Sequence, residues 1–306
     1  MGKLLIVGSM AFDAIETPFG KTGRILGGAG TFIGLAASQF KVDAAIVSVV
    51  GDDFPQSYMD ILKNKNIDLT GVEVVKGGKT FFWEGKYHND LNSRDTLVTE
   101  LNVLEHFDPI VPDSYQGCEY LMLGNLSPQV QRTVIERLNT KPKLIAMDTM
   151  NFWMDIALDE LKKTIALVDV LIINDEEARQ LSGVYSLVKA AKKIRKMGPK
   201  YLIIKKGEHG VLAIHPDGLI ALPAYPTETV VDPTGCGDTF AGTLASRLAL
   251  GSGEVSVNEL KFALIHATVT ASFTLQSFGV NALHQLEEED YTGRIESYMK
   301  MTGTGK

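Results

Sequence analysis

The sequence predicts an α/β fold built on a mostly parallel central sheet. Strand and helix patterns alternate from residue 119 to residue 272, which is typical of crossover connections in a parallel sheet. Residues 3–8 form an apolar run that we expect to be the first, buried strand. Residues 225–242 run from a β-favouring stretch through glycines into a helical pattern, which indicates a strand, a turn and a helix.

The first half of the chain contains two segments whose residue pattern differs from the strand and helix alternation. Residues 14–26 carry short alternating stretches broken by proline and glycine, and residues 72–99 carry clustered β-formers between glycines. We expect both segments to be strands of one small sheet that projects from the body. Between them, residues 35–40 are expected to be helical and residues 44–50 to form a strand.

The second half of the chain continues the alternation without an internal repeat, so we expect a single domain over residues 1–306. Pro128 suits the first turn of a helix, and the turn at residues 216–218 favours a hairpin. Strands are expected at 120–125, 144–148, 167–174 and 201–205, helices at 128–138, 176–181 and 187–197, and the hairpin at 211–222.

The composition is that of an ordinary globular protein, with 45% hydrophobic and 22% charged residues. No apolar run approaches the roughly 20 residues of a membrane span, and the apolar N-terminal stretch is short for a secretion signal. The net charge of −7 argues against nucleic-acid binding, and the basic run at 192–196 fits a solvated helix end. Because Cys118 and Cys236 are too few for a disulfide framework, we expect a cytoplasmic protein without membrane or nucleic-acid partners.

The segment 231–238, Val-Asp-Pro-Thr-Gly-Cys-Gly-Asp, carries the strongest chemical signal in the chain. At the start of its helix, unpaired backbone N–H groups and the helix dipole favour an anion. Gly235 and Gly237 let the backbone approach that anion closely. Asp238 either caps the helix or takes a proton from an attacking hydroxyl, as a general base does in phosphoryl transfer.

This segment resembles the signature of the ribokinase/PfkB-like carbohydrate kinases, with Cys236 at a position usually held by alanine. The resemblance implies that the backbone of Gly235, Cys236 and Gly237 cradles the transferred phosphoryl group. It also implies that Asp238 is the base that activates the acceptor hydroxyl, with ATP and Mg²⁺ as cofactors.

The resemblance spans nearly the whole chain, from Gly8 to Gly279. It implies a ribokinase-like three-layer α/β/α core with a mostly parallel central sheet and a small β-sheet lid. The lid would comprise residues 14–26 and 72–99. In relatives such a lid closes over the acceptor and often serves as a dimer surface, so a homodimer through the lid is expected.

On the nucleotide side, Asn174 and Glu177 open a predicted helix, where a cap and first-turn acids have a structural reason of their own. The resemblance implies that they also position Mg²⁺ and the nucleotide phosphates, with Glu177 acting through water. Lys205, Gly207 and Gly210 match a strand end that lies along the nucleotide in relatives, and a plain hairpin turn explains them equally.

Further ligands follow from the resemblance alone. His266 falls where relatives place residues beside the adenine, although a core or rim histidine fits the pattern as well. Gly279 and Asn281 match positions that close the same pocket. With Asp232 and Thr234 they match a site that holds a monovalent cation in some relatives, so K⁺ is a further expected ligand.

On the acceptor side, Asp13 matches an Asp that binds sugar hydroxyls in relatives, and each carboxylate oxygen accepts a hydrogen bond from a diol. Gly27 and Gly28 match backbone contacts to the acceptor. Asn125 is a further polar group for a polyol, as are lid residues such as Trp83.

Three positions depart from ribokinases themselves: Ala11 and Phe32 replace asparagine, and Ala29 replaces lysine. The loss of three polar groups argues against ribose. Phe32 either binds an acceptor with an apolar portion, such as a nucleoside, or only packs.

The sequence therefore predicts an ATP-dependent kinase of a small sugar or polyol, with a nucleoside kinase as the alternative. Gly28, Gly30 and Gly34 also approach a dinucleotide fingerprint, which leaves a nicotinamide-dependent oxidoreductase as a second class. In a dinucleotide-binding fold these glycines would follow the first strand directly, whereas here a long segment interrupted by proline and glycine separates them from Gly8. This separation favours the kinase. A catalytically silent sugar sensor is a third class.

Overall fold

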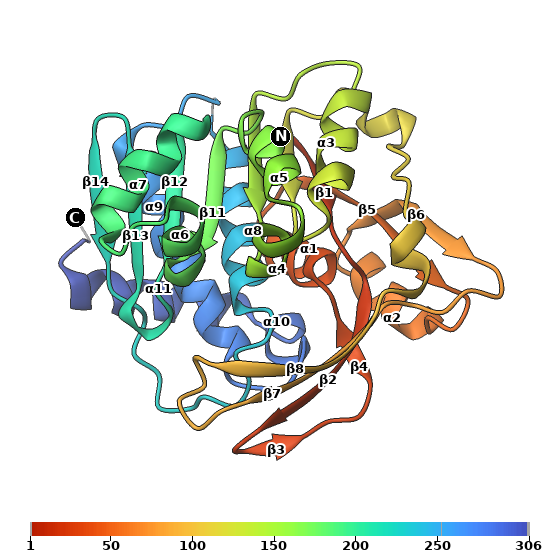
Figure 1. Cartoon of the computed structure of the whole chain (residues 1–306). Coiled ribbons are helices and arrows are strands. Elements are labelled where there is room, and N and C mark those ends of the chain that lie inside the picture. Colours follow the sequence, from red (N-terminus) through yellow and green to blue (C-terminus); the bar gives the residue numbers. More distant parts are fainter. Residues whose placement is uncertain (1, 252, 305–306) are drawn as a thin grey trace.

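The computed structural model describes residues 2–251 and 253–304 and confirms the predicted α/β fold (Figure 1). Its main sheet has nine strands. From one edge to the other they are β14 (Gly218–Leu222), β13 (Val211–His215), β12 (Tyr201–Lys205), β11 (Val170–Asn174), β10 (Leu144–Asp148), β9 (Tyr120–Leu123), β1 (Lys3–Val7), β5 (Asp43–Gly51) and β6 (Asp68–Val75).

All neighbours from β12 to β6 pair in parallel, whereas β12, β13 and β14 pair antiparallel, as the predicted hairpin requires. Because parallel strands end at the same edge of a sheet, the carboxyl ends of β10, β11 and β12 lie side by side. The last residues of these three strands are Asp148, Asn174 and Lys205, so their side chains lie at the same edge of the sheet.

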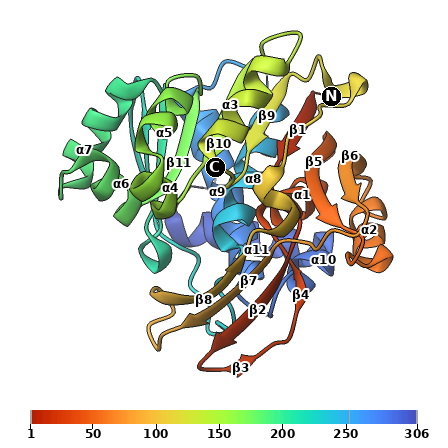
Figure 2. The same ribbon diagram turned by 45° about the vertical axis from the view of Figure 1, so that its right-hand side comes forward.

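Two hydrophobic cores lie on the two faces of the main sheet, which makes the body three layers thick (Figure 2). Successive residues of β1 alternate between them: Leu4 and Ile6 join one core, and Leu5 and Val7 join the other. The first core is covered by α1 (Ala29–Ser38), α2 (Gln56–Lys63), α8 (Cys236–Ala249), α9 (Val257–Thr274), α10 (Asn281–His284) and α11 (Glu288–Thr302).

The second core is covered by α3 (Pro128–Arg137), α4 (Asn151–Ile156), α5 (Leu158–Ile165), α6 (Asp175–Ser182) and α7 (Leu187–Ile194). Short 3₁₀ helices η1 (Asn102–His106), η2 (Asp113–Tyr115), η3 (Arg195–Met197) and η4 (Gly207–His209) complete the connections. Within the described residues, no helix combines the length and apolar character needed to cross a membrane.

A second, smaller sheet projects from the body, at the bottom of Figure 1. We call it the lid. It contains β2 (Ala11–Thr17), β3 (Gly20–Lys21), β4 (Ile25–Gly27), β7 (Phe82–Tyr87) and β8 (Arg94–Glu100), with the order β3-β2-β7-β8 and β4 paired to β2.

The expectation that all of residues 72–99 belong to the lid is wrong at its beginning. Residues 72–75 are the end of β6, which pairs in parallel with β5 at the edge of the main sheet. The β-formers of an exposed edge strand and of a lid strand look alike in sequence, and only the partner strand distinguishes them.

Two other elements differ from the sequence expectation. Helix α1 begins at Ala29, six residues before the predicted start, because Ser9 Oγ accepts a hydrogen bond from the Ala29 backbone N–H at 3.1 Å and caps the glycine-rich turn. Residues 225–231 form no strand. The backbone N–H of Val231 instead donates to the Leu275 carbonyl at 2.7 Å, at the end of α9.

The close approach of α1 and α8 depends on Gly242. A Cβ atom there would lie 2.6 Å from the Ile33 carbonyl oxygen and 2.7 Å from its Cα, both backbone atoms that a rotamer change cannot move. We expect Gly242→Ala to destabilise the protein by roughly 1–3 kcal/mol, measured by urea unfolding. Gly293→Ala in α11, where a Cβ meets nothing within 4 Å, is the matched control and should stabilise by about 0.5–1 kcal/mol. Equal effects of the two substitutions would contradict this packing argument.

Candidate active site

The N-terminus of α8 forms a small pocket of backbone amides. Gly235 is the N-cap residue, with a φ of 77° that favours glycine. Its N–H group and that of Gly237 donate to no acceptor among the described residues, whereas Cys236 and Thr239 donate to the carbonyls of Pro233 and Gly235. The free amides and the helix dipole together make this the predicted anion site.

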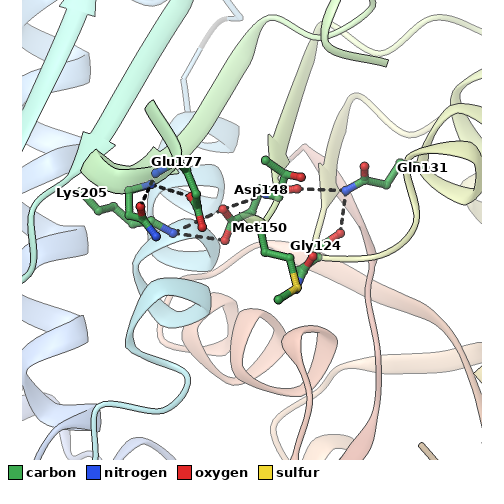
Figure 3. A network of polar contacts seen from close by, with 9 residues as sticks. Gly124, Gln131, Asp148, Met150, Glu177 and Lys205 are labelled. Atoms are coloured by element: carbon green, nitrogen blue, oxygen red, sulfur yellow. Dashed lines mark hydrogen bonds and ion pairs between the residues drawn. The ribbon is translucent and has the colours of Figure 1, made fainter. Parts of the chain in front are cut away.

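A buried charge cluster lies beside these amides (Figure 3). Lys205, the last residue of β12, places its Nζ 3.2 Å from Oδ2 and 3.3 Å from Oδ1 of Asp148, the last residue of β10. The same Nζ would be only 3.0 Å from a Cβ on Gly237. Lys205 therefore lies against the start of α8, where the anion would bind.

The cluster contains more negative than positive side chains. Burial alone would lower the pKa of Lys205, but the carboxylates of Asp148, Glu177 and Asp238 hold it above its usual value. Burial and the Asp148 carboxylate raise the pKa of Asp238 to about 7, with Lys205 and Arg94 opposing the rise. A pKa near 7 suits a general base that must hold and release a proton at neutral pH.

Asn174 and Glu177 form a complete capping box at the start of α6. Asn174 Oδ1 accepts from the Glu177 N–H at 2.8 Å, and Glu177 Oε2 accepts from the Asn174 N–H at 2.7 Å. Burial raises the pKa of Glu177 to about 7. The structural explanation of both residues is thus correct, and Oε1 of Glu177 is left for another partner.

These donors fit Mg²⁺ bound together with a nucleotide. Mg²⁺ takes one or two carboxylates and completes its shell with water and phosphate oxygens. Glu177 and Asp148 supply two carboxylates, and the described residues contain no group of three or more metal-ligating side chains that would hold an ion by itself.

The acceptor-side residues meet at the junction of lid and body. A Cβ on Gly27 would lie 1.9 Å from Oδ2 of Asp13, so only glycine leaves room for this carboxylate. A backbone hydrogen bond from Gly28 holds Asp13, and burial with the charges of Asp232 and Asp238 raises its pKa to about 7. The structure therefore brings Asp13, Gly27 and Gly28 together near Asp238, as the sequence predicts.

Phe32 and Asn125 have packing roles. The Phe32 ring is 1% exposed and lies directly under Gly235, where a Cβ would be 2.4 Å from the ring. Asn125 accepts from Trp153 Nε1 at 2.9 Å and approaches Met150 Sδ at 3.0 Å, which binds the end of β9 to α4. Both side chains are occupied by the protein itself.

The turn after β12 contains Gly207 and Gly210 and reaches the lid. Both glycines have positive φ, and Lys206 N–H donates to the Gly210 carbonyl at 2.7 Å, so the predicted turn is present. Glu208 Oε1 in this turn accepts from Nδ2 of Asn92, in the β7–β8 connection, at 3.2 Å. The lid therefore contacts the turn after β12, beside Lys205.

His266 does not join the site. Its ring packs against Phe40, Phe262 and Tyr291, and Nδ1 is hydrogen-bonded to the Tyr291 hydroxyl. It lies eight residues along α9 from Thr274, about 12 Å from the helix end that meets α8. Burial lowers the pKa of His266 to about 4, as expected of a neutral core histidine.

Asp232 links the turn before α8 to the segment that follows α9. It is fully buried, accepts from Thr234 N–H at 2.8 Å and from Gly279 N–H at 3.1 Å, and has no ion-pair partner among the described residues. Thr234 in turn donates through Oγ1 to the Tyr87 hydroxyl at 3.1 Å. Gly279 is thus bound to Asp232, one of the residues predicted to hold a monovalent cation.

Three residues of the site were not singled out from the sequence: Asp148, Tyr87 and Arg94. Asp148 ends a predicted strand, and a carboxylate at the carboxyl end of a parallel strand is a signal that could have identified it. Tyr87 and Arg94 come from the lid, and nothing local in their sequence indicates their partners. Gln131 supports the site from behind, because its Nε2 donates to the Gly124 and Asp148 carbonyls at 2.9 Å each.

The glycines of the dinucleotide-like pattern are explained by packing. A Cβ on Gly30 would lie 2.8 Å from the Gly8 carbonyl oxygen, and one on Gly34 would lie 2.8 Å from Ile46 Cδ1. They allow α1 to lie close to the main sheet.

Comparison with known proteins agrees with this geometry. A model of the "pfkB family carbohydrate kinase" matches residues 1–286. The chain is 29% identical to a cytidine kinase of Thermococcus kodakarensis over 245 residues, covering 78% of this chain and 86% of the relative. It is 23% identical over 288 residues to an ATP-dependent 6-phosphofructokinase of Thermoanaerobacterium thermosaccharolyticum, covering 85% and 86%.

Solved structures share the fold. A nucleoside kinase of Methanocaldococcus jannaschii, described as an archaeal member of the ribokinase family, superposes with a TM-score of 0.78 at 20% identity, covering 97% of this chain and 99% of that one. A putative ribokinase II of E. coli in complex with ATP and Mg²⁺ superposes with a TM-score of 0.79 at 18% identity, covering 97% and 100%.

The raised pKa of Asp238 predicts a pH-dependent stability. Between the ordinary aspartate pKa of about 4 and the folded-state pKa of about 7, the folded protein keeps this proton and the unfolded chain loses it. The stability that the protonated group contributes is therefore complete below about pH 4 and is lost as the pH rises through 7. Asp238→Asn should raise the urea midpoint of the ligand-free protein at pH 8, with a smaller gain at pH 5.

Asp60→Asn, on the exposed surface of α2, is the control for that measurement and should change stability by less than about 0.5 kcal/mol at both pH values. A gain for Asp238→Asn that is larger at pH 5 than at pH 8 would show that the carboxyl is not held protonated by burial.

Proposed function

Because the chain belongs to the pfkB family of carbohydrate kinases, we propose that it transfers the γ-phosphate of ATP to a hydroxyl of a small sugar or polyol. One observation carries the proposal: Asp238 lies in the first turn of α8, beside the free amides, and its charge acts both on Lys205, on the nucleotide side, and on Asp13, on the acceptor side. This is the arrangement that an in-line transfer between two bound substrates requires.

In the proposed reaction, Asp13 binds hydroxyls of the acceptor and orients one of them toward Asp238. Asp238 takes the proton of that hydroxyl as its oxygen bonds to the γ-phosphorus and the bond to the bridging oxygen of ADP breaks. The free N–H groups of Gly235 and Gly237, on either side of Cys236, and the ammonium of Lys205 stabilise the charge on the transferred phosphoryl group. Mg²⁺ would be held by Glu177 and Asp148, through water, and would neutralise nucleotide phosphate charge.

Gly207, Gly210 and Asn174 would line the nucleotide in this proposal, because they surround the ends of β11 and β12 next to Lys205. His266 is left out, since its ring is enclosed by aromatic side chains near the C-terminal end of α8, away from the amides at its start.

K⁺ at Asp232 and Thr234 is part of the proposal as well. The buried Asp232 carboxylate has no ion-pair partner within the described chain, and a cation would balance its charge. A homodimer through the lid is supported by Phe19 and Leu97, which are 63% and 51% exposed on its surface. A cytoplasmic location agrees with the two unpaired cysteines.

A nucleoside is the second candidate acceptor, and Trp83 favours it. Trp83 is the register partner of Asp13, so both side chains point from the same face of the lid. Its half-buried indole lies across Gly85, where a Cβ would be 2.1 Å from the ring. An aromatic face beside the sugar-binding carboxylate would stack on a base, and one relative is named a cytidine kinase.

The central test is a panel of sugars, polyols and nucleosides assayed for ADP release with MgATP. We expect Asp238→Asn to lower kcat on the accepted substrate by roughly 10²–10⁴-fold, because the base is lost, and to leave ATP binding intact. Asp60→Asn, remote on α2, should retain wild-type activity. ADP release that needs no acceptor, or full activity of Asp238→Asn, would overturn the proposed function.

Trp83→Ala separates the two acceptor classes. If a base stacks on Trp83, the substitution should raise the KM for nucleosides roughly tenfold to hundredfold, since stacking is worth about 1–3 kcal/mol, and should change the KM for sugars little. Tyr185→Ala removes an aromatic side chain that is 84% exposed on the body, outside the lid, and serves as the control. An equal loss for sugars and nucleosides would indicate that Trp83 only supports the lid.

A further inference from the structure

The lid is held over the charge cluster by contacts on either side of one residue, Arg94. The Tyr87 hydroxyl accepts from Thr234 Oγ1 at 3.1 Å, in the turn before α8. Asn92 reaches Glu208 in the turn after β12. Arg94 is the antiparallel register partner of Tyr87, so its side chain leaves the lid on the same face as Tyr87.

The other cations of the lid have partners. Lys86 Nζ lies 2.6 Å from Glu16, Lys21 lies 3.3 Å from the same carboxylate, and Arg24 lies 3.5 Å from Glu100 and over the Phe82 ring. Arg94 has no hydrogen bond or ion pair with any described residue. Its guanidinium lies near aromatic rings only, with Cζ 5.7 Å from the Trp83 centroid and 6.0 Å from the Tyr87 centroid.

The charge of Arg94 acts on the phosphoryl-transfer side of the site. It lowers the pKa of Asp238 and of Glu177, although burial raises both overall. The charges that act on Asp13 are those of Asp232 and Asp238, and Arg94 is not among them. The exposed guanidinium is therefore near enough to Asp238 and Glu177 for its charge to act on them, and it has no partner among the described residues that would hold it away from an anion.

We propose that Arg94 is a catalytic residue of the lid, whose guanidinium binds the phosphoryl oxygens while the group moves from ADP to the acceptor. The inference rests on the proposed kinase function. A planar guanidinium donates two parallel hydrogen bonds to phosphate oxygens, and its positive charge offsets the carboxylates of Asp148, Glu177 and Asp238. Because Arg94 belongs to the lid, the stabilising charge arrives only when the lid is closed and water is excluded.

The first test compares Arg94→Gln, Arg94→Lys and the control Arg24→Gln. Arg94→Gln should lower kcat roughly a hundredfold with little change in the KM of ATP or acceptor, since the contact is made in the transition state. Arg94→Lys should recover part of the loss, because a lysine keeps the charge but not the paired hydrogen bonds. Arg24→Gln, paired to Glu100 away from the cluster, should retain wild-type kinetics.

A rise in acceptor KM with unchanged kcat would overturn the inference, because Arg94 would then bind an anionic part of the acceptor. Wild-type kinetics of Arg94→Gln, in a preparation where Asp238→Asn is inactive, would overturn it and leave the proposed function standing.

The second test does not depend on turnover. The affinity for ADP with Mg²⁺ and aluminium fluoride, a mimic of the phosphoryl group in transit, is measured against the affinity for ADP with Mg²⁺ alone. Arg94→Gln should lose most of the extra affinity that aluminium fluoride confers on the wild type and keep the affinity for ADP. Equal affinities of wild type and variant for the aluminium fluoride complex would overturn the inference, even if no acceptor in the panel were phosphorylated.

Discussion

The site depends on one buried ion pair, between Lys205 and Asp148. Neither residue is stable alone in this place: Lys205 would be a buried cation, and Asp148 would add to the repulsion among Glu177 and Asp238. Pairing brings the ends of β10 and β12 to a fixed separation across β11, and Gln131 fixes β10 from the other side. The pair leaves an excess of carboxylates, and that excess is what a bound Mg²⁺ ion and a lid arginine would balance.

The second constraint is that several side chains of the site lie directly against the backbone, at positions where only glycine leaves room. The Phe32 ring lies under Gly235, the Asp13 carboxylate lies on Gly27, and the Lys205 ammonium lies on Gly237. A Cβ on Gly27 or Gly235 would clash with the carboxylate or the ring, and a Cβ on Gly237 would press on the Lys205 ammonium. Gly27 and Gly237 set the positions of charges, whereas Gly242 sets the spacing between α1 and the part of α8 that follows the amides and Asp238. The same residue type therefore serves the site in one segment and the core in another.

The sequence predicts the parts of this site whose chemistry is local. The turn at residues 231–238 contains its own glycines, its helix start and the proposed base, so its local structure follows from neighbouring residues, although the strand expected before it is absent. The sequence leaves Phe32 and His266 open between binding a ligand and packing, and it makes Asn125 a candidate for the acceptor. In the structure all three contact residues distant in the chain, such as Trp153 and Tyr291. Arg94 and Asp148 were not found for the same reason, since their partners come from other strands. Residues 72–75 follow the same rule, because an edge strand is defined by the strand that it pairs with.

The lid contacts must be weak for the proposed cycle to run. Asn92 and Glu208 are exposed, and polar contacts of this kind contribute about 0–1 kcal/mol, so thermal motion opens them readily for exchange of substrate and product. The Tyr87–Thr234 contact is partly buried and joins the lid to the same turn that presents the amides of α8. Closure is then favoured most when a nucleotide phosphate lies between Arg94 and Lys205 and attracts both cations. Because such a phosphate is present only with a nucleotide bound, the proposal predicts that the lid closes fully on the loaded site and opens when the phosphorylated product and ADP separate.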